Sequence, residues 1–487
     1  MTVTPKIRRL LNKRFLLIAL AAIAISLVIY SWLVSSLAWK RTLRAAGFVD
    51  ELPEPGRGDR LLIVAPHPDD ETLGCGGLIR QAMANGAAVD VVIMTNGDAS
   101  EWSVLLGERE IPWNPANLIE LGRKRQRESL RALSEAGVSA HHVHFLGFPN
   151  NGLVALWRPE HWRHSDLYQS PYTRVAFSPY EQSLTPDAPY CGQQVLSDLM
   201  AVMHVVRPTQ IYVTHPRDIH PDHWATSCFV SYALATAEVK GAEWAKSAQL
   251  WGYLVHWPRY PAPMRSGLGL ELLPPPELSG AEAQWYRLPL TRDEARRKLA
   301  AIRTYRSQGP RFDRLLQSFA RQDEIFEALS GKELKPGAAA QWRTRNAHRR
   351  GLGGAEVRGL SLRVGDDLVA EAKVTTAPRK IPESGYVCLD LRTWDEHLAP
   401  VIATVYLRAL GQAAAVRLEA PSGPRPLPAE VDADTPGKIG ITHLSLPTKS
   451  QAGQDLFVTC YGSVKDRLTD PAVASWVRFR RDAAAAR

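Results

Sequence analysis

Residues 61–77, LLIVAPHPDDETLGCGG, constrain the fold more than any other stretch of this 487-residue chain. The apolar run at 61–65 predicts a short buried strand, and the glycines at 74–77 open a helix-like run. Between them stand His67, Asp69, Asp70 and Glu71. Ligands of open α/β sheets bind beyond the carboxyl ends of the strands, so this stretch predicts a strand that ends in a functional turn.

The side chains of this turn are typical of a metal site. His67 and Asp70 are three residues apart in a tight turn that contains Pro68, so both could hold one divalent ion. Asp69 then points elsewhere and is left for chemistry. Imidazole and carboxylate together suit Zn²⁺ or Fe²⁺ better than Ca²⁺ or Mg²⁺. The alternative interpretation is a polar turn that caps the following helix.

A second polar cluster, THPRDIHPDH at 214–223, follows the apolar run at 211–213. In it, His220 and His223 bracket Asp222. One histidine would complete a His/Asp/His metal site, and the other would remain for chemistry. The spacing alone does not decide which histidine is the ligand.

The two clusters together resemble the PIG-L/LmbE-like family of metal-dependent N-acetylglucosaminyl deacetylases. The resemblance rests on APHPDDE at 65–71 and HPDH at 220–223, and it covers about residues 60–328. Weaker matches follow in the family's order: Thr95 to Asp98 (TNGD), Arg125-x-x-Glu128, Leu146 to Pro149 (LGFP), Lys298 to Gln308 (KLAAIRTYRSQ) and Arg321-x-x-Glu324-x-Phe326. Asn150 and Asn151 depart from the family, which commonly has an aspartate after this proline.

The resemblance implies roles for most of these residues. His67, Asp70 and His223 would bind the metal, which is Zn²⁺ with Fe²⁺ as the alternative. Asp69 would be the general base, and His220 would stabilise the oxyanion or assist protonation of the amine.

The resemblance and the residue types also suggest an outer layer of the site. Asp222 would orient one of the histidines. Asp98 and Arg125 would support the site or touch the substrate, although a solvated helix face is the alternative for Arg125.

The implied activity is hydrolytic N-deacetylation of an N-acetylglucosamine-type residue in a membrane-proximal glycan or glycolipid. The alternatives are an amidase that acts on another acyl amide or a small glycoside, and an inactive glycan-binding protein. A nucleotide-binding protein is disfavoured, because the first helix lacks the expected G-x-G-x-x-G fingerprint.

The N-terminal residues carry most of the net charge of +9, because residues 1–49 contain eight Lys or Arg and no acidic residue. Nothing therefore predicts a nucleic-acid partner. Residues 15–39 carry no charge, and a helix needs roughly 20 apolar residues to cross a bilayer. The flanking charges favour a single-pass anchor with the N-terminus inside and a periplasmic or otherwise extracytoplasmic catalytic domain. A cleaved signal peptide is the alternative.

The remaining pattern predicts an α/β protein. Strand-like runs at 61–65, 88–94, 142–146 and 210–213 alternate with helical runs, which indicates a Rossmann-like three-layer parallel sheet. The predicted organisation is a basic flank and transmembrane anchor (1–44), a linker (45–59), the deacetylase domain (60–330), a second linker (331–356) and a β-sandwich-like domain (357–487).

Two further features leave alternatives open. The aromatic segment 150–192 interrupts the alternation, and it would either bind a sugar or pack on itself. Cys388 and Cys460 lie on strand-like runs of the last domain and could pair if that domain lies outside the cytoplasm, but the sequence does not fix their geometry.

Overall fold

The structure is a computed structural model, and it describes most of the chain from residue 49 onward. The described residues are 25–26, 49–99, 114–265, 267–279, 283–308, 313–334, 338–343, 357–364, 369–376, 385–394, 399–408, 416–420, 423–426, 429–435, 438–445, 455–464 and 467–479.

An eight-stranded sheet with the order β1-β7-β8-β6-β5-β2-β3-β4 organises the first part of the chain. Its strands are β1 (Val49–Glu51), β2 (Arg60–Ala65), β3 (Ala88–Thr95), β4 (Val143–Phe148), β5 (Gln210–Thr214), β6 (Gln249–Tyr253), β7 (Trp285–Pro289) and β8 (Asp323–Ala328). The five neighbours β6, β5, β2, β3 and β4 run parallel. Their carboxyl ends therefore meet at one edge of the sheet.

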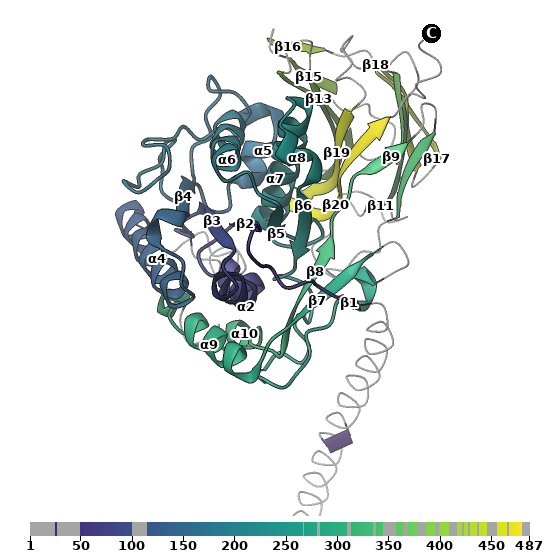
Figure 1. The fold of residues 1–487 in the computed structure, drawn as a ribbon. Coiled ribbons are helices and arrows are strands. Elements are labelled where there is room, and N and C mark those ends of the chain that lie inside the picture. Colours follow the sequence, from purple (N-terminus) through teal and green to yellow (C-terminus); the bar gives the residue numbers. More distant parts are fainter. Residues whose placement is uncertain are drawn as a thin grey trace, which may run out of the picture.

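Helices cover both faces of this sheet (Figure 1). One face carries α2 (Asp70–Ala84), α4 (Pro115–Glu135), α9 (Arg292–Ile302) and α10 (Asp313–Gln317). The other carries α5 (Leu153–Trp157), α6 (Gly192–Val206), α7 (Pro221–Val239) and α8 (Glu243–Ser247). Successive side chains of a strand point to opposite faces, so Leu61 and Ile63 join the first core while Leu62 and Val64 join the second. This explains why β2 is apolar from Leu61 to Ala65.

The sheet is mixed, which corrects the prediction of a purely parallel one. β8 runs antiparallel to both β6 and β7. The segment 290–328 contains α9, the one-turn helix α10 and then β8. Asp323 and Glu324 are buried at the start of β8 and obscure its strand pattern.

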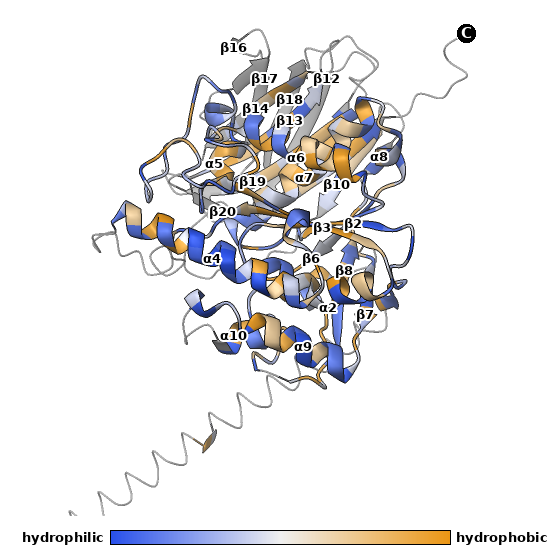
Figure 2. Ribbon diagram, turned by 60° about the vertical axis from the view of Figure 1, so that its left-hand side comes forward, coloured by the Kyte–Doolittle hydropathy of each residue, from blue (hydrophilic) through white to orange (hydrophobic). Residues whose placement is uncertain are grey.

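The prediction of a transmembrane helix at 15–39 is also corrected. No helix among the described residues is long and apolar enough to cross a bilayer. The longest of them, α4, is largely hydrophilic along its length (Figure 2). Of the predicted segment, only Ile25 and Ser26 belong to the described residues, and the rest lies outside them. The predicted single-pass topology and extracytoplasmic location depended on this helix and lack support.

Two further sheets follow the α/β part, drawn in green to yellow in Figure 1. One has the order β10-β11-β12-β18-β17 and comprises β10 (Ala339–Arg343), β11 (Val357–Val364), β12 (Val369–Thr376), β17 (Ala429–Thr435) and β18 (Lys438–Ser445). The other has the order β16-β15-β14-β13-β19-β20-β9 and comprises β9 (Lys332–Leu334), β13 (Gly385–Trp394), β14 (Pro400–Arg408), β15 (Val416–Ala420), β16 (Gly423–Pro426), β19 (Asp455–Val464) and β20 (Arg467–Phe479). The two sheets pack together through β11, which contacts β19 and β20.

The C-terminal sheets share a core with the α/β part. Strands β19 and β20 contact α7, and one continuous hydrophobic cluster contains residues of α7 together with Trp394, Phe457 and Tyr461. The aromatic segment 150–192 contributes to the same cluster, since Trp157 and Trp162 are buried in it. These two tryptophans are therefore packing residues, which favours the self-packing alternative for this part of the segment.

A buried arginine of the C-terminal sheets, Arg392, contacts two tryptophans of the α/β part. Arg392 of β13 is fully buried, and its guanidinium carbon lies 3.4 Å from the ring centroid of Trp157 and 4.5 Å from that of Trp162. Its Nη2 donates a hydrogen bond to the carbonyl of Trp157 and lies 3.5 Å from Asp390 Oδ2. The cation thus stacks on aromatic faces and also compensates a buried carboxylate.

We expect Arg392→Met to destabilise the protein by about 3–5 kcal/mol, because it leaves Asp390 buried without its cation. Urea or thermal unfolding measures the loss. Arg363→Met on β11 is the matched control, since Arg363 is exposed. An Arg392→Met melting curve that coincides with the control would contradict this account.

Cys388 and Cys460 form no disulfide in the structure, although both are buried. The register of β13 and β19 pairs Cys388 with Tyr461 and Cys460 with Leu389. Because neighbouring positions along a strand face opposite sides of the sheet, the two thiols point away from each other. The pairing that the sequence left open is therefore absent from the structure.

Candidate metal centre

The candidate site forms where β2 and β5 end side by side. These strands are neighbours in the sheet, with Val64 paired to Val213. The turn after β2 carries His67 and Asp69, and Asp70 opens α2 directly behind it. The turn after β5 carries Asp218 and His220, and the first turn of α7 carries Asp222 and His223. The parallel pairing therefore brings together two clusters that are far apart in the sequence.

Asp70 links the two predicted histidine ligands. Its Oδ2 lies 3.1 Å from His67 Nδ1 and 3.1 Å from His223 Nε2. Ligand atoms of a tetrahedral Zn²⁺ lie about 2.0–2.2 Å from the ion and so roughly 3.3 Å from one another. All three side chains are buried. The donor types of these three side chains suit a divalent metal, and Asp70 lies at about the ligand-to-ligand distance from each histidine.

Two overlapping groups of three residues place their candidate ligand atoms within 4.8 Å of one another among the described residues. One is His67, His220 and His223, and the other is Asp70, His223 and His256. His223 belongs to both groups. The site thus holds more candidate donors than the three that a catalytic zinc takes from protein.

Each of the two outer imidazole nitrogens faces a carboxylate. His67 Nε2 lies 3.2 Å from Asp222 Oδ2, and His223 Nδ1 lies 3.2 Å from Asp218 Oδ2. Backbone amides fix both carboxylates in place: Asn151 and Leu153 donate to Asp222, and Val255 and His256 donate to Asp218. This pattern leaves His67 Nδ1 and His223 Nε2 directed toward Asp70, as in metal sites whose histidines are oriented by carboxylates.

The electrostatics follow from this pairing. Burial opposes ionisation of His67, but Asp222 and Asp70 outweigh it and raise its pKa to about 9. Burial likewise opposes ionisation of Asp70, yet His223 and His67 hold its pKa well below the usual value. Burial and the neighbouring imidazoles lower the pKa of His220 well below 6.5. The cluster therefore favours an ionised Asp70 and a neutral His220.

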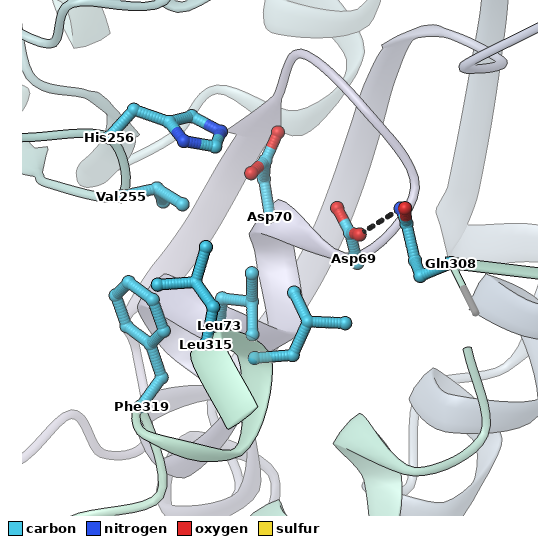
Figure 3. Close-up of a pocket in the computed structure, with 9 residues that line it drawn as sticks. Asp69, Asp70, Leu73, Val255, His256, Gln308, Leu315 and Phe319 are labelled. Atoms are coloured by element: carbon cyan, nitrogen blue, oxygen red, sulfur yellow. Dashed lines mark hydrogen bonds between the residues drawn. The ribbon is translucent and has the colours of Figure 1, made fainter. Parts of the chain in front are cut away.

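Asp69 is held in an unusual backbone conformation beside this cluster. Its φ is 128°, a region that residues other than glycine rarely adopt. Glu71 accepts a hydrogen bond from the Asp69 amide at 2.9 Å, and Arg125 donates to the Pro68 carbonyl at 2.9 Å. The carboxylate receives Gln308 Nε2, the contact that Figure 3 shows as a dashed line. The surrounding groups thus stabilise a strained turn in which the Asp69 carboxylate faces Gln308 and Arg125.

The Arg125-x-x-Glu128 motif of α4 contacts and stabilises the turn that contains Asp69. Arg125 Nη2 lies 3.4 Å from Asp69 Oδ2, and its Nη1 donates to the Gly97 carbonyl at 3.0 Å. Glu128 accepts the backbone amide of Ser307 at 3.1 Å, which positions the segment that carries Gln308. Arg125 is therefore a buried support of Asp69 and not part of a solvated helix face.

Asp98 lies at the edge of this support. It is buried and accepts a hydrogen bond of 2.6 Å from the Tyr180 hydroxyl. Burial raises its pKa to about 6, against the opposing effect of the Tyr180 hydrogen bond. Tyr180 belongs to the aromatic segment 150–192, so a direct role of Asp98 toward the substrate stays a prediction.

Sequence reasoning missed several residues of the site. Asp218 belongs to the second polar cluster, but nothing in the spacing indicates that it, and not Asp222, faces His223. His256 follows β6, a strand that the sequence pattern did not predict. Gln308 was noticed only as the end of a family motif, and its contact with Asp69 spans 239 positions of sequence.

Comparison with known proteins identifies relatives of the α/β part. Residues 62–234 match the PIG-L family model, described as GlcNAc-PI de-N-acetylase. This confirms the family resemblance seen in the sequence.

The curated relatives carry one enzyme name, 1D-myo-inositol 2-acetamido-2-deoxy-alpha-D-glucopyranoside deacetylase. The protein of Mycobacterium sp. (strain KMS) is 32% identical over 213 residues, which are 43% of this chain and 56% of that protein. That of Mycolicibacterium smegmatis is 32% identical over 180 residues, or 37% of this chain and 54% of that protein. The chain thus spans about half the length of the curated relatives that it matches.

Solved structures that resemble part of this chain were also found. The N,N'-diacetylchitobiose deacetylase of Pyrococcus horikoshii has 19% identity, a TM-score of 0.33 and coverage of 54% of this chain and 76% of that chain. The zinc-inhibited form of a teicoplanin deacetylase has 20% identity, a TM-score of 0.34 and coverage of 55% and 97%.

Proposed function

Residues 62–234 belong to the PIG-L family, and on that premise we propose that the protein is a zinc-dependent N-deacetylase that releases acetate from an N-acetylglucosamine-type residue. The membrane-proximal setting depended on the predicted N-terminal helix and is not part of the proposal. The zinc assignment rests on the mixed imidazole and carboxylate donors, for which Fe²⁺ is the alternative.

The main support for the proposal is that two adjacent aspartates, Asp69 and Asp70, have different contacts. Asp70 lies between two imidazole nitrogens at 3.1 Å, whereas Asp69 is held apart by Glu71, Arg125 and Gln308. A binding protein has no need to hold a carboxylate in a strained turn beside a metal site. A hydrolase does need one, because a positioned base must accept the proton of the attacking water.

The chain's own residues would act as follows. His67, Asp70 and His223 would hold a zinc ion, which supplies Lewis-acid chemistry by lowering the pKa of a water molecule and polarising the amide carbonyl. Asp69 would accept the proton of that water as the new carbon–oxygen bond forms. It would then pass the proton to the amide nitrogen as the carbon–nitrogen bond breaks, so acetate and a free amine leave.

His220 would stabilise the developing negative charge on the carbonyl oxygen. Its Nδ1 accepts the backbone amide of Asp222 at 3.2 Å, so the neutral ring carries its proton on Nε2. That N–H can donate a hydrogen bond without the ring being charged. Of the two roles expected from the sequence, the oxyanion role therefore does not require a protonated His220.

We expect Asp222→Asn to weaken zinc binding by about 10–100-fold, because the neutral amide no longer makes His67 more basic. Asp218→Asn should act on His223 in the same way. Calorimetric titration with Zn²⁺ measures both, with Asp166→Asn as the control on an exposed aspartate. Unchanged zinc affinity in both variants would show that these carboxylates do not support the metal ligands.

An acetate-release assay tests the proposed function. The zinc-loaded full chain is offered N-acetylglucosamine, N,N'-diacetylchitobiose and N-acetylglucosaminyl-inositol, the last being the substrate type in the relatives' name. We expect acetate from at least one of them, lost with a chelator and restored by zinc. Saturable sugar binding without acetate would favour a glycan-binding protein, and release only from non-sugar amides would favour the amidase alternative.

A further inference from the structure

A small cavity of about 20 Å³ adjoins the proposed site (Figure 3). Its polar side is formed by Asp69 and Asp70 together with His256 and Gln308. Its other side is entirely hydrocarbon and consists of Leu73, Val255, Leu315, Leu316 and Phe319. The cavity therefore has residues of the proposed site on one side and these five hydrocarbon side chains, the apolar floor, on the other.

The apolar floor is built by three separate parts of the fold. Leu73 lies one turn beyond Asp70 on α2, Val255 follows β6, and Leu315 belongs to α10. In Figure 3 the side chains of Leu73, Leu315 and Phe319 lie on the side of the cavity opposite His256. Leu73, Val255 and Phe319 are at most 3% exposed, so these walls exclude water.

The chemistry of the walls decides which part of an amide substrate fits there. A sugar ring carries hydroxyl groups, and burying them against hydrocarbon without hydrogen-bond partners costs about 1–3 kcal/mol each. An alkyl group instead gains about 0.8 kcal/mol for each CH₂ buried. With the amide carbonyl at the metal, the alkyl end of the acyl group suits this floor and the sugar suits the open side.

The volume limits the length of that alkyl group. A cavity must offer roughly 10–15 Å³ to hold one water molecule, so about 20 Å³ accommodates a single group of that size. A methyl group is of that size, whereas two or three further methylenes would collide with Leu315 and Phe319.

We propose that this cavity is the acyl-binding pocket of the enzyme and that Leu315, Val255 and Phe319 restrict its substrates to N-acetyl and shorter acyl groups. The inference rests on the proposed deacetylase function. Beyond that function, it states that the acyl group of the substrate enters the cavity and that these three side chains limit the length of the acyl group.

The test compares glucosamine derivatives that carry N-formyl, N-acetyl, N-propionyl and N-butyryl groups. For the unmodified zinc enzyme, we expect kcat/KM to fall at least about 10-fold from acetyl to butyryl, within the range for methylenes that a pocket rejects. Leu315→Ala should raise the ratio of butyryl to acetyl turnover at least 10-fold. Val255→Ala, which shortens another part of the apolar floor, should shift the ratio in the same direction and serves if Leu315→Ala does not fold.

Leu299→Ala is the matched control, because Leu299 is a half-buried leucine on the neighbouring helix α9 that does not line the cavity. Its acyl profile should equal that of the unmodified protein. Equal turnover of all four acyl groups, or an unchanged profile in folded Leu315→Ala and Val255→Ala, would overturn the acyl pocket and leave the deacetylase intact. No release of any acyl group would instead overturn the proposed function and this inference with it.

Discussion

Asp69→Asn should lower kcat for acetate release by about 10²–10⁴-fold, the range that a positioned general base contributes, while zinc remains bound. The substitution keeps the size of the side chain and one oxygen to accept Gln308, but its amide cannot accept a proton. Because Asp69 stands apart from the atoms that face the metal, the loss should appear in kcat and not in zinc content. Steady-state kinetics and metal analysis on the same preparation measure both.

Asp50→Asn on the edge strand β1 is the control for this variant, since Asp50 is exposed. It should retain full activity and full zinc content. If Asp69→Asn hydrolyses the substrate at nearly the unmodified rate, another group is the base. If Asp69→Asn loses zinc, then Asp69 is a ligand and the assignment of different roles to Asp69 and Asp70 is wrong.

The second large effect concerns Asp70→Ala, which should abolish zinc binding at micromolar concentrations. Asp70 Oδ2 lies 3.1 Å from both predicted histidine donors, so its removal takes away the atom that joins them. The affinity should fall by more than the roughly 10–100-fold expected for an outer carboxylate. Calorimetry measures the affinity, and the rise in melting temperature that zinc causes by binding the native state should disappear.

Histidine variants distinguish the proposed ligands from the other candidate groups. The proposed set of His67, Asp70 and His223 predicts that His220→Ala and His256→Ala still bind zinc, whereas His223→Ala does not. A centre made of His67, His220 and His223 predicts loss of zinc in His220→Ala. A centre made of Asp70, His223 and His256 predicts loss in His256→Ala and retention in His67→Ala.

The first half of the α/β sheet could be predicted from the sequence because its strands are mostly apolar. The runs at 61–65, 88–94, 142–146 and 210–213 correspond to β2, β3, β4 and β5 within one or two residues at each end. β6 (QLWGY), β7 (WYRLP) and β8 (DEIFEA) are short and carry polar residues, so no period distinguishes them from loops. β8 runs antiparallel to its neighbours, and without it the sheet was predicted to be parallel throughout.

The candidate site could also be predicted only in part from the sequence. Its two clusters could be predicted to meet because each follows a buried strand, and the family pattern then favoured His223 over His220. Which carboxylate faces which imidazole depends on backbone amides of distant loops, such as Asn151 for Asp222 and Val255 for Asp218. No spacing within either cluster encodes those contacts.

The contacts of Lys298 and Glu324 also escaped sequence reasoning. They form a buried ion pair, and Glu324 accepts the backbone amides of Gly77 and Leu78 on α2. The pair thus anchors the helix that begins at Asp70, and the contact spans 26 positions between the two side chains. The late family motifs therefore position the metal turn and supply no group to the reaction itself, apart from the Gln308 contact with Asp69.

The most direct test of the account measures acetate and free amine together, from one N-acetylglucosaminide and the full chain loaded with zinc. We predict equal amounts of the two products, abolished by a chelator, restored by zinc, and reduced at least 100-fold in Asp69→Asn at equal zinc content. Product formation that is unaffected by chelation, or a zinc-loaded protein that releases neither product from any acylated amino sugar, would contradict the account.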